Sequence, residues 1–202
     1  MQPKQLNELL QNIDIYLLDQ ILKGRIHSNM KILDAGCGTG RNSAYLINEK
    51  FDLTGIDSDK QKINCLQEKF PRNNFLISNV KKMPFKEGQF DYIICNAVLH
   101  FAENTNDFFK MLTELFRVLK LKGTLFIRMT SDFGIEDKVK EIKEGVYKIP
   151  DGSTRFLLTQ KVLKTFKRNF KFDFIEPLKT VNVNDLRCMT TLVIKKNGSI
   201  TD

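Results

Sequence analysis

The chain has 202 residues and a formal net charge of +8, a length that supports one domain with a sizeable core and is too short for two ordinary ones. Its four cysteines form no Cys-x-x-Cys pair, so neither a zinc site nor a disulfide framework is indicated. No apolar run approaches the roughly 20 residues of a membrane span, and the N-terminus lacks the apolar core of a signal peptide, so we expect a cytoplasmic protein.

The first part of the chain alternates between helical periodicity and short apolar runs. Apolar residues recur at three- and four-residue intervals from Leu6 to Ile21, which predicts one amphipathic helix within residues 1–22. A helix capped by Asp57 or Ser58 is predicted over residues 59–70. The other predicted elements are strand 31–35, helix 42–50, strand 52–56 and strand 74–78.

The second part of the chain continues this alternation. The predicted elements are strand 92–95, helix 106–120, strand 123–129 and two long strands, 171–183 and 187–196, with a turn at Asn184 and Asp185. Strands separated by helices predict βαβ units in a mostly parallel sheet, and the last two strands add an antiparallel pair at one edge. We expect one domain over residues 1–197 and a frayed tail at 198–202.

The stretch ILDAGCGTGRNS places glycines at 36, 38 and 40, where the first predicted strand meets the helix that follows it. An open parallel sheet binds ligands outside the carboxyl ends of its strands, which is where this stretch lies. Glycine lets the backbone turn tightly and approach a ligand, and the start of a helix offers unpaired amides to a carboxylate or phosphate. The alternative is a tight turn in which the glycines serve packing alone.

Two acids accompany this loop. Asp57 follows Gly36 by 21 residues, at the end of the second strand, where a carboxylate accepts both hydroxyls of a ribose. Asp34 precedes the glycines, and an acid there repels a pyrophosphate but suits an α-ammonium group. A dinucleotide-binding loop needs Gly or Ala at position 41, which is Arg here. S-adenosylmethionine, which has a ribose, an ammonium and a carboxylate, fits this pattern.

Four motifs in order resemble the class I S-adenosylmethionine-dependent methyltransferases. They are ILDAGCGTG, LTGIDSD, FLISNVKKMPFKEGQFDYIICNAVLHF and LFRVLKLKGTLFIR, which together extend from about Lys31 to Met129. The resemblance implies a Rossmann-like α/β fold, a mostly parallel seven-stranded sheet with helices on both faces and an antiparallel C-terminal strand pair. The continuation GRNS with Tyr45 and Leu46 is further similar to tellurite-resistance-type methyltransferases over a short stretch.

The resemblance also implies how the cofactor is held. Asp34 and the backbone of Gly36, Cys37 and Gly38 are expected to hold the methionine part, and Asp57 the ribose. The residues expected at the adenine are Ser58, Asn79 and Val80, and the backbone of Cys95 is expected beside the methionine part. The family usually has an acid where Asn79 stands, so the amide carbonyl is expected to accept the adenine hydrogen bond with less help from charge.

The catalytic group is less determined by the sequence. Methyl transfer needs the acceptor lone pair opposite the leaving sulfur, and a base only where the acceptor must lose a proton. His100, just past the fourth strand, is the candidate base, and packing in the loop is the alternative for its ring. Cys95 is interpreted as a core thiol because the proline that precedes the nucleophile of RNA cytosine methyltransferases is missing.

The acceptor is expected to meet the N-terminal helix, loop 96–105 and the insertion 130–159. Charges, aromatics and three glycines in the insertion favour either a substrate lid or a plain surface excursion. Arg41, Arg128 and Arg155 are candidates for binding an acidic acceptor, and a structural ion pair is the alternative for each.

Two functional classes follow from these observations, and the fold alone cannot choose between them. The first is methyl transfer to a small molecule, and the candidate arginines favour an anionic one. The second is methyl transfer to RNA or protein that docks on the basic surface. Between residues 152 and 173 there are six Lys or Arg residues and no acid, a pattern that is typical of a solvated helix face and favours the first class. A cofactor-binding protein that regulates a partner is the non-enzymatic alternative.

Overall fold

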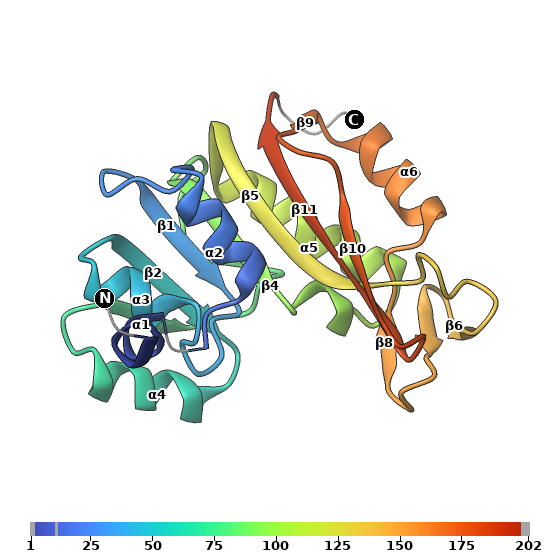
Figure 1. Cartoon of the computed structure of the whole chain (residues 1–202). Coiled ribbons are helices and arrows are strands. Elements are labelled where there is room, and N and C mark those ends of the chain that lie inside the picture. The colour runs from blue at the N-terminus through green and yellow to red at the C-terminus, as the bar shows by residue number, and fades with distance from the viewer. Residues whose placement is uncertain (1–2, 11, 199–202) are drawn as a thin grey trace.

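The computed structural model describes residues 3–10 and 12–198, and within them the chain forms an α/β domain (Figure 1). The helices are α1 (Pro3–Leu10), α2 (Ile15–Leu22), α3 (Ser43–Asn48), α4 (Lys60–Lys69), the 3-10 helix η1 (Leu99–Phe101), α5 (Thr105–Val118) and α6 (Gln160–Asn169). The strands are β1 (Lys31–Ala35), β2 (Asp52–Asp57), β3 (Asn74–Ile77), β4 (Phe90–Asn96), β5 (Leu119–Ser131), β6 (Lys140–Lys143), β7 (Val146–Lys148), β8 (Thr154–Phe156), β9 (Phe172–Phe174), β10 (Lys179–Val183) and β11 (Arg187–Lys196).

The main sheet has the strand order β10-β11-β5-β4-β1-β2-β3, with β9 paired to β11 off this path. Strands β3, β2, β1, β4 and β5 run parallel, and β11 is antiparallel to both β5 and β10. This confirms the Rossmann-like fold with a seven-stranded path and an antiparallel C-terminal pair. Because the five parallel strands share one carboxyl edge, the loops after β1, β2, β3 and β4 meet there.

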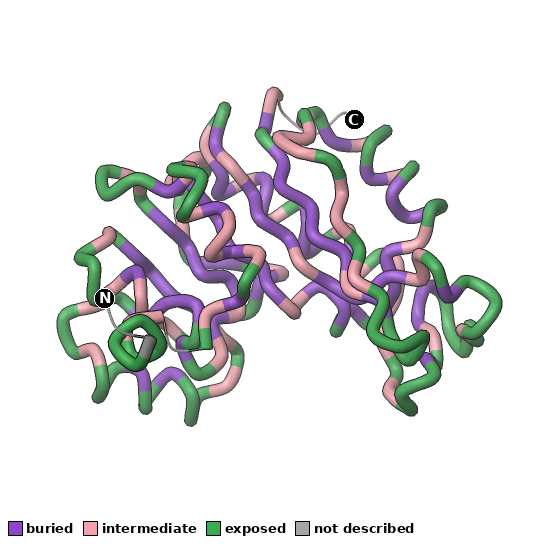
Figure 2. The backbone as a smooth tube through the Cα atoms, in the orientation of Figure 1, coloured by how far each residue is buried: buried purple, intermediate pink, exposed green. Residues whose placement is uncertain are grey.

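Hydrophobic cores cover both faces of the sheet. One cluster packs α2, α3 and α4 on the sheet through residues such as Leu17, Leu46 and Ile63. The other packs α5 and α6 on the opposite face, with Leu112 and Phe166 among its members. In Figure 2 the buried residues, in purple, lie mainly in the central strands and on the inner sides of the helices. The near-continuous apolar strands of the sequence reflect this burial from two sides.

The N-terminal helix predicted as one element within residues 1–22 is two helices, and that prediction was wrong. Asp14 has an extended backbone (φ −63°, ψ 128°), and its side chain accepts a hydrogen bond from the Tyr16 amide at 3.0 Å. Asp14 is therefore the N-cap that begins α2, and its extended conformation separates α2 from α1. The three- and four-residue spacing of apolar residues cannot distinguish one helix from two in register.

The helix predicted over residues 59–70 is α4, but its cap differs from the prediction. The carboxylate of Asp59 accepts from the amides of Gln61 and Lys62, so Asp59 is the N-cap in place of Asp57 or Ser58. The Asp57 carboxylate is thereby left for the ligand cavity.

The long strand predicted over residues 171–183 is also divided. Its two parts, β9 and β10, are separated at Pro177, which has no amide hydrogen to donate to a sheet ladder. The predicted turn between the last two strands is confirmed, because Asn184 and Asp185 have left-handed φ values of 50° and 58°. The tail predicted for residues 198–202 lies, apart from Gly198, outside the described residues.

The insertion 130–159 forms a small antiparallel sheet of β6, β7 and β8, which Figure 1 shows beside the main sheet. Its inner part is packed: the ring of Phe156 is buried and stacks on Phe108 with centroids 4.6 Å apart. The Leu158 amide donates to the Thr130 carbonyl at 3.0 Å. In contrast, all four residues of β6 are exposed.

Within the described part of the chain, no helix has the length and apolar character needed to cross a membrane.

Candidate functional site

A cavity of about 710 Å³ lies at the carboxyl edge of the parallel strands. Its walls come from the loops after β1, β2, β3 and β4, together with η1 and the first turns of α5. Of the residues predicted from the sequence, those that line it are Gly36, Cys37, Gly38, Arg41, Asp57, Ser58, Asn79 and Val80. The volume is within the usual range of small-molecule sites.

The three loop glycines all have left-handed backbones, with φ of +85° at Gly36, +56° at Gly38 and +79° at Gly40. A Cβ at Gly36 would clash with the Val98 side chain, and one at Gly40 would lie 2.6 Å from Leu66 Cδ2. A Cβ at Gly38 would meet no atom within 4 Å. Packing inside the protein therefore explains two of the glycines, whereas Gly38 is required by its backbone conformation and borders open space in the cavity.

Asp57 is held rigidly at the end of β2. Its Oδ2 accepts a hydrogen bond from the Gly38 amide at 2.9 Å, and its Oδ1 accepts one from the Asp59 amide at 2.9 Å. Each carboxylate oxygen keeps a lone pair for a further donor. The two strand-end loops thus present a fixed bidentate acceptor to the cavity, the geometry that a ribose diol requires.

Asp34 lies beneath the glycine loop and is not among the residues that line the cavity. Its side chain is 1% exposed and accepts a hydrogen bond from the Ser43 hydroxyl at 2.6 Å, which ties β1 to the start of α3. Burial raises the pKa of Asp34 to about 6, because the charged form is poorly solvated there. Direct contact of Asp34 with a methionine ammonium stays a prediction, and the geometry favours a supporting role under the loop.

The residues expected at the adenine surround the part of the cavity next to β3. Asn79 begins a turn in which its Oδ1 accepts from the Lys81 amide at 2.9 Å. One lone pair of the Asn79 carbonyl is therefore already used, which leaves one for an adenine amino group. Lys81 itself forms an ion pair with Asp107 at 2.9 Å, across the cavity wall.

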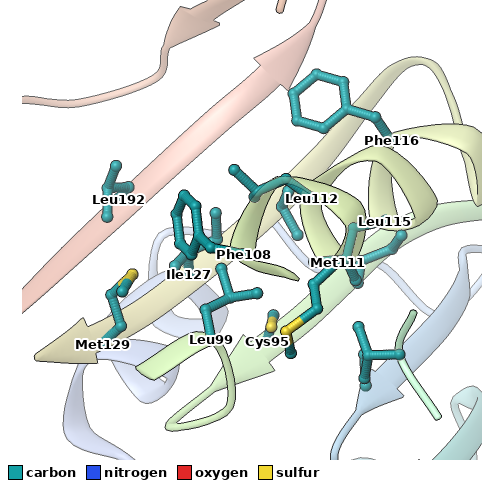
Figure 3. Close-up of a cluster of buried hydrophobic side chains, with 14 of the residues drawn as sticks. Cys95, Leu99, Phe108, Met111, Leu112, Leu115, Phe116, Ile127, Met129 and Leu192 are labelled. Carbon is teal, nitrogen blue, oxygen red and sulfur yellow. The ribbon is translucent and has the colours of Figure 1, made fainter. Parts of the chain in front are cut away.

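Cys95 is buried in the core and does not line the cavity. Figure 3 shows its sulfur beside Met111 and Leu99, between β4 and α5. Burial raises the pKa of the Cys95 thiol well above its ordinary value, which disfavours a thiolate nucleophile. The chain passes from Cys95 into Asn96 and Ala97, and these two residues line the cavity instead.

His100, the candidate base, also lies outside the residues that line the cavity. Its ring is buried, packs edge-to-face on Phe101 and accepts from the Thr130 amide through Nδ1 at 3.4 Å. Burial, together with the smaller effect of the charges of Arg155 and Arg187, lowers the pKa of His100 to about 4. This arrangement fits a packed and hydrogen-bonded imidazole.

The three candidate arginines have different surroundings. Arg41 lines the cavity, and both Arg41 and Arg128 face the carboxylate of Asp14, at 3.5 Å and 3.4 Å. Arg155 lies over the ring of Phe101, with its guanidinium carbon 5.1 Å from the ring centre. Arg128 and Arg155 do not line the cavity. The shared contact with Asp14 brings Arg41 and Arg128 together, and Arg155 lies apart from them.

Asn96 and Asp14 are not singled out by the sequence, although both lie in segments that were expected to meet the acceptor, loop 96–105 and the N-terminal helix. Asn96 lines the cavity at the end of β4, and Asp14 joins the two arginines from α2. The position of Asn96 at a strand end is a signal that could have identified it. Nothing in the sequence near Asp14 indicates that its carboxylate pairs with Arg41 and Arg128.

The comparisons with known proteins agree with this site. A protein-family profile described as a methyltransferase domain matches residues 33–127, the segment that carries every loop named above except those of α2 and the insertion. The chain belongs to the class I S-adenosylmethionine-dependent methyltransferase family. The narrower similarity to tellurite-resistance-type members of this family stays a prediction.

Individual relatives are similar to the chain at moderate identity. It is 33% identical over 111 residues to the putative methyltransferase YqeM of Bacillus subtilis, a match that covers 53% of this chain and 45% of YqeM. It is 31% identical over 162 residues to the uncharacterized protein MJ1123 of Methanocaldococcus jannaschii, covering 80% of this chain and 71% of that one. The chain spans less than half the length of the first two curated relatives.

Among solved structures, the fold is similar to that of a Burkholderia thailandensis methyltransferase crystallised with 1,6-didemethyltoxoflavin and S-adenosylhomocysteine. The TM-score is 0.63 at 17% identity, and the match covers 98% of this chain and 92% of the other. At this identity the likeness shows the fold alone.

Proposed function

We propose that this protein transfers the methyl group of S-adenosylmethionine to a small-molecule acceptor. The observation that carries the proposal is the Asp57 carboxylate, which two backbone amides fix in the wall of a 710 Å³ cavity beside a left-handed glycine loop. The relatives support methyl transfer as the reaction. The Burkholderia enzyme is named as a methyltransferase of the small molecule 1,6-didemethyltoxoflavin, and this supports the acceptor class.

The residues present fit the cofactor. Asp57 would accept the ribose hydroxyls, with Ser58, Asn79 and Val80 around the adenine and the Gly36–Gly38 backbone beside the methionine part. When bound, S-adenosylmethionine supplies a methyl group on a positively charged sulfur, which makes that methyl electrophilic. The rigid attachment of Asp57 orients the nucleoside in advance, so less ordering remains to be done when the acceptor arrives.

Positioning is the main catalytic contribution that this site can make. A general base is needed only for acceptors that lose a proton at or before the transfer. His100 as that base stays a prediction, because its ring is packed against Phe101 and its pKa is lowered to about 4. The role of the insertion as a lid also stays a prediction.

We further propose a cytoplasmic location, which the free thiols of all four cysteines support.

A transfer assay with methyl-labelled S-adenosylmethionine tests the proposal. The protein is incubated with a cell extract divided into small-molecule, nucleic-acid and protein fractions, and the label is followed in each. We expect label in the small-molecule fraction. Label confined to nucleic acid or protein would favour the second functional class, and absence of transfer from a protein that binds the cofactor would favour the non-enzymatic alternative.

A further inference from the structure

The amide of Asn96 is buried at the ligand cavity without using any of its hydrogen-bonding capacity. The residue is 7% exposed and lines the cavity, yet neither its Oδ1 nor its Nδ2 has a partner among the described residues. The buried Nε of Arg128 has none either within the same part of the chain. Buried polar groups are normally paired, because each one left unpaired destabilises the folded protein. Asn96 lines the cavity and Arg128 lies next to it on β5, so a ligand that reaches Asn96 could supply the missing partners.

Asn96 and Arg128 are neighbours on one face of the sheet. They are register partners in the parallel pair of β4 and β5, and the Ala97 amide donates to the Arg128 carbonyl at 2.8 Å. Side chains of paired residues in a sheet project from the same face. The Arg128 guanidinium lies 5.0 Å from the centre of the Tyr16 ring, so this is the face that α2 covers.

The order of the strands shows which part of the ligand reaches this pair. In the proposed function, the adenine lies at the end of β3, the ribose at β2 and the methionine part over the loop after β1. The end of β4 follows in the sheet order, two strand spacings or about 10 Å from the end of β2. The group that approaches from β4 and β5 is therefore the methyl acceptor.

The cluster of Arg41, Arg128 and Asp14 favours an anion, and Arg41 is its member that lines the cavity. One buried carboxylate, that of Asp14, faces the two guanidinium groups of Arg41 and Arg128, so the cluster keeps one positive charge in excess. A carboxylate on the acceptor would take hydrogen bonds from Arg128 Nε and Asn96 Nδ2 with its two oxygens. Asn96 Oδ1 then remains to accept from a hydroxyl or amine of the same molecule.

We infer that Asn96 and Arg128 form the recognition site for a small acceptor that carries a carboxylate beside a hydroxyl or amine. This inference rests on the proposed function. The acceptor lone pair forms the new bond to the methyl carbon, the electron pair of the broken carbon–sulfur bond stays on sulfur to give S-adenosylhomocysteine, and the proton of the hydroxyl or amine leaves to water. Arg155 stacks on Phe101 and is not a strand neighbour of Asn96, so it is not part of this recognition site.

The first arm of the test asks whether the acceptor is acidic. The small-molecule fraction of the cell extract is passed over an anion-exchange resin, and each pool is assayed for acceptance of label from methyl-labelled S-adenosylmethionine. We expect the acceptor in the pool that binds the resin. Label only in the unbound pool would overturn this inference and leave the proposed function standing, whereas label only in nucleic acid or protein, or none at all, would contradict the proposed function itself.

The second arm uses variants of the two residues. Asn96→Ala removes both hydrogen bonds, and we expect it to lower kcat/KM for the acidic pool about tenfold or more. Asn96→Asp keeps the shape but places a negative charge against the acceptor, so its loss should exceed that of Asn96→Ala. Arg128→Gln should lower transfer as well. Asn74→Ala and Arg72→Gln, at exposed positions far from the cavity walls, are the matched controls and should leave transfer unchanged.

Cofactor affinity separates acceptor recognition from other roles. S-adenosylhomocysteine should bind to both Asn96 variants within about threefold of its affinity for the unmodified protein, by calorimetry. If the affinity falls as much as the transfer does, Asn96 belongs to the cofactor site and the inference is wrong. An Asn96→Asp variant that transfers as well as Asn96→Ala would also overturn it, because the acceptor would then carry no negative charge near this residue.

Discussion

We expect cofactor binding to depend most directly on Asp57. We expect Asp57→Ala to weaken S-adenosylmethionine binding by roughly 10- to 150-fold, because the variant loses charged hydrogen bonds worth about 1.5 to 3 kcal/mol. Calorimetry measures this loss. Asp52→Ala, at the exposed opposite end of the same strand, is the control and should bind normally. Unchanged affinity in Asp57→Ala would remove the ribose assignment.

His100 should affect stability in a defined pH range. Its folded pKa of about 4 lies below the ordinary value of about 6.5, so the unfolded chain binds the proton more tightly. The neutral ring therefore contributes stability that is complete above about pH 6.5 and is lost as the pH falls through 4, a change of the order of 3 kcal/mol. Denaturant unfolding at a series of pH values measures it.

The effect of His100 is measured as the difference in free energy of unfolding between the unmodified protein and His100→Gln at each pH. Asp34 and Asp132, whose pKa values are both raised to about 6, change stability with pH in the opposite direction to His100. Their contribution to the free energy of unfolding is present at low pH and is lost as the pH rises toward 6. Subtracting the free energy of unfolding of the variant from that of the unmodified protein at each pH cancels the effects of these two carboxyl groups. If the unmodified protein shows no extra loss of stability between pH 6.5 and 4, the imidazole is not held in its neutral form. A turnover rate that instead followed a pKa near neutrality and vanished in the variant would support the base.

At the scale of elements, the packing of β11 against the end of α5 depends on the buried ammonium group of Lys196. Lys196 donates to the carbonyls of Phe116 and Leu119, at 2.6 Å and 2.8 Å, where the last carbonyls of a helix have no partners within the helix. We expect Lys196→Met to lower the free energy of unfolding by about 2 to 3 kcal/mol, because buried carbonyls lose charged donors.

The matched control for this element is the neighbouring position on the same strand. Lys195 is exposed on the opposite face of β11, so Lys195→Met should change the free energy of unfolding by less than about 0.5 kcal/mol. Equal effects of the two substitutions would show that the carbonyl contacts of Lys196 contribute little.

At the scale of the whole molecule, the basic residues of α6 lie away from the cavity. Lys161, Lys164 and Lys167 are exposed, and α6 contributes none of the cavity's lining residues, while its apolar side packs Phe166 into the core. We expect simultaneous neutralisation of these lysines to leave transfer to the small-molecule acceptor within about twofold of the unmodified protein. Generic RNA should bind weakly, with an affinity that falls steeply as salt rises. A triple variant that loses most activity, together with salt-sensitive activity in the unmodified protein, would indicate a polyanionic acceptor.

The sequence by itself determined the parallel sheet, the glycine loop and the acid at the end of β2. These features depend on local patterns, namely apolar runs bounded by helices and residues at fixed intervals along one strand-turn-helix unit. The antiparallel hairpin at Asn184 and Asp185 was predictable for the same reason.

The tertiary structure decided the polar composition of the site. Asp34 follows the family pattern in sequence, yet its side chain is turned beneath the loop toward Ser43, because β1 is covered on both faces. Cys95 and Asn96 are adjacent, but the alternation of a strand buries the first beside α5 and leaves the second at the cavity under α2. The meeting of Asp14 with Arg41 and Arg128 joins three elements that are far apart in the chain. No local pattern specifies that contact, since it exists only once α2 is packed across the ends of β1 and β5.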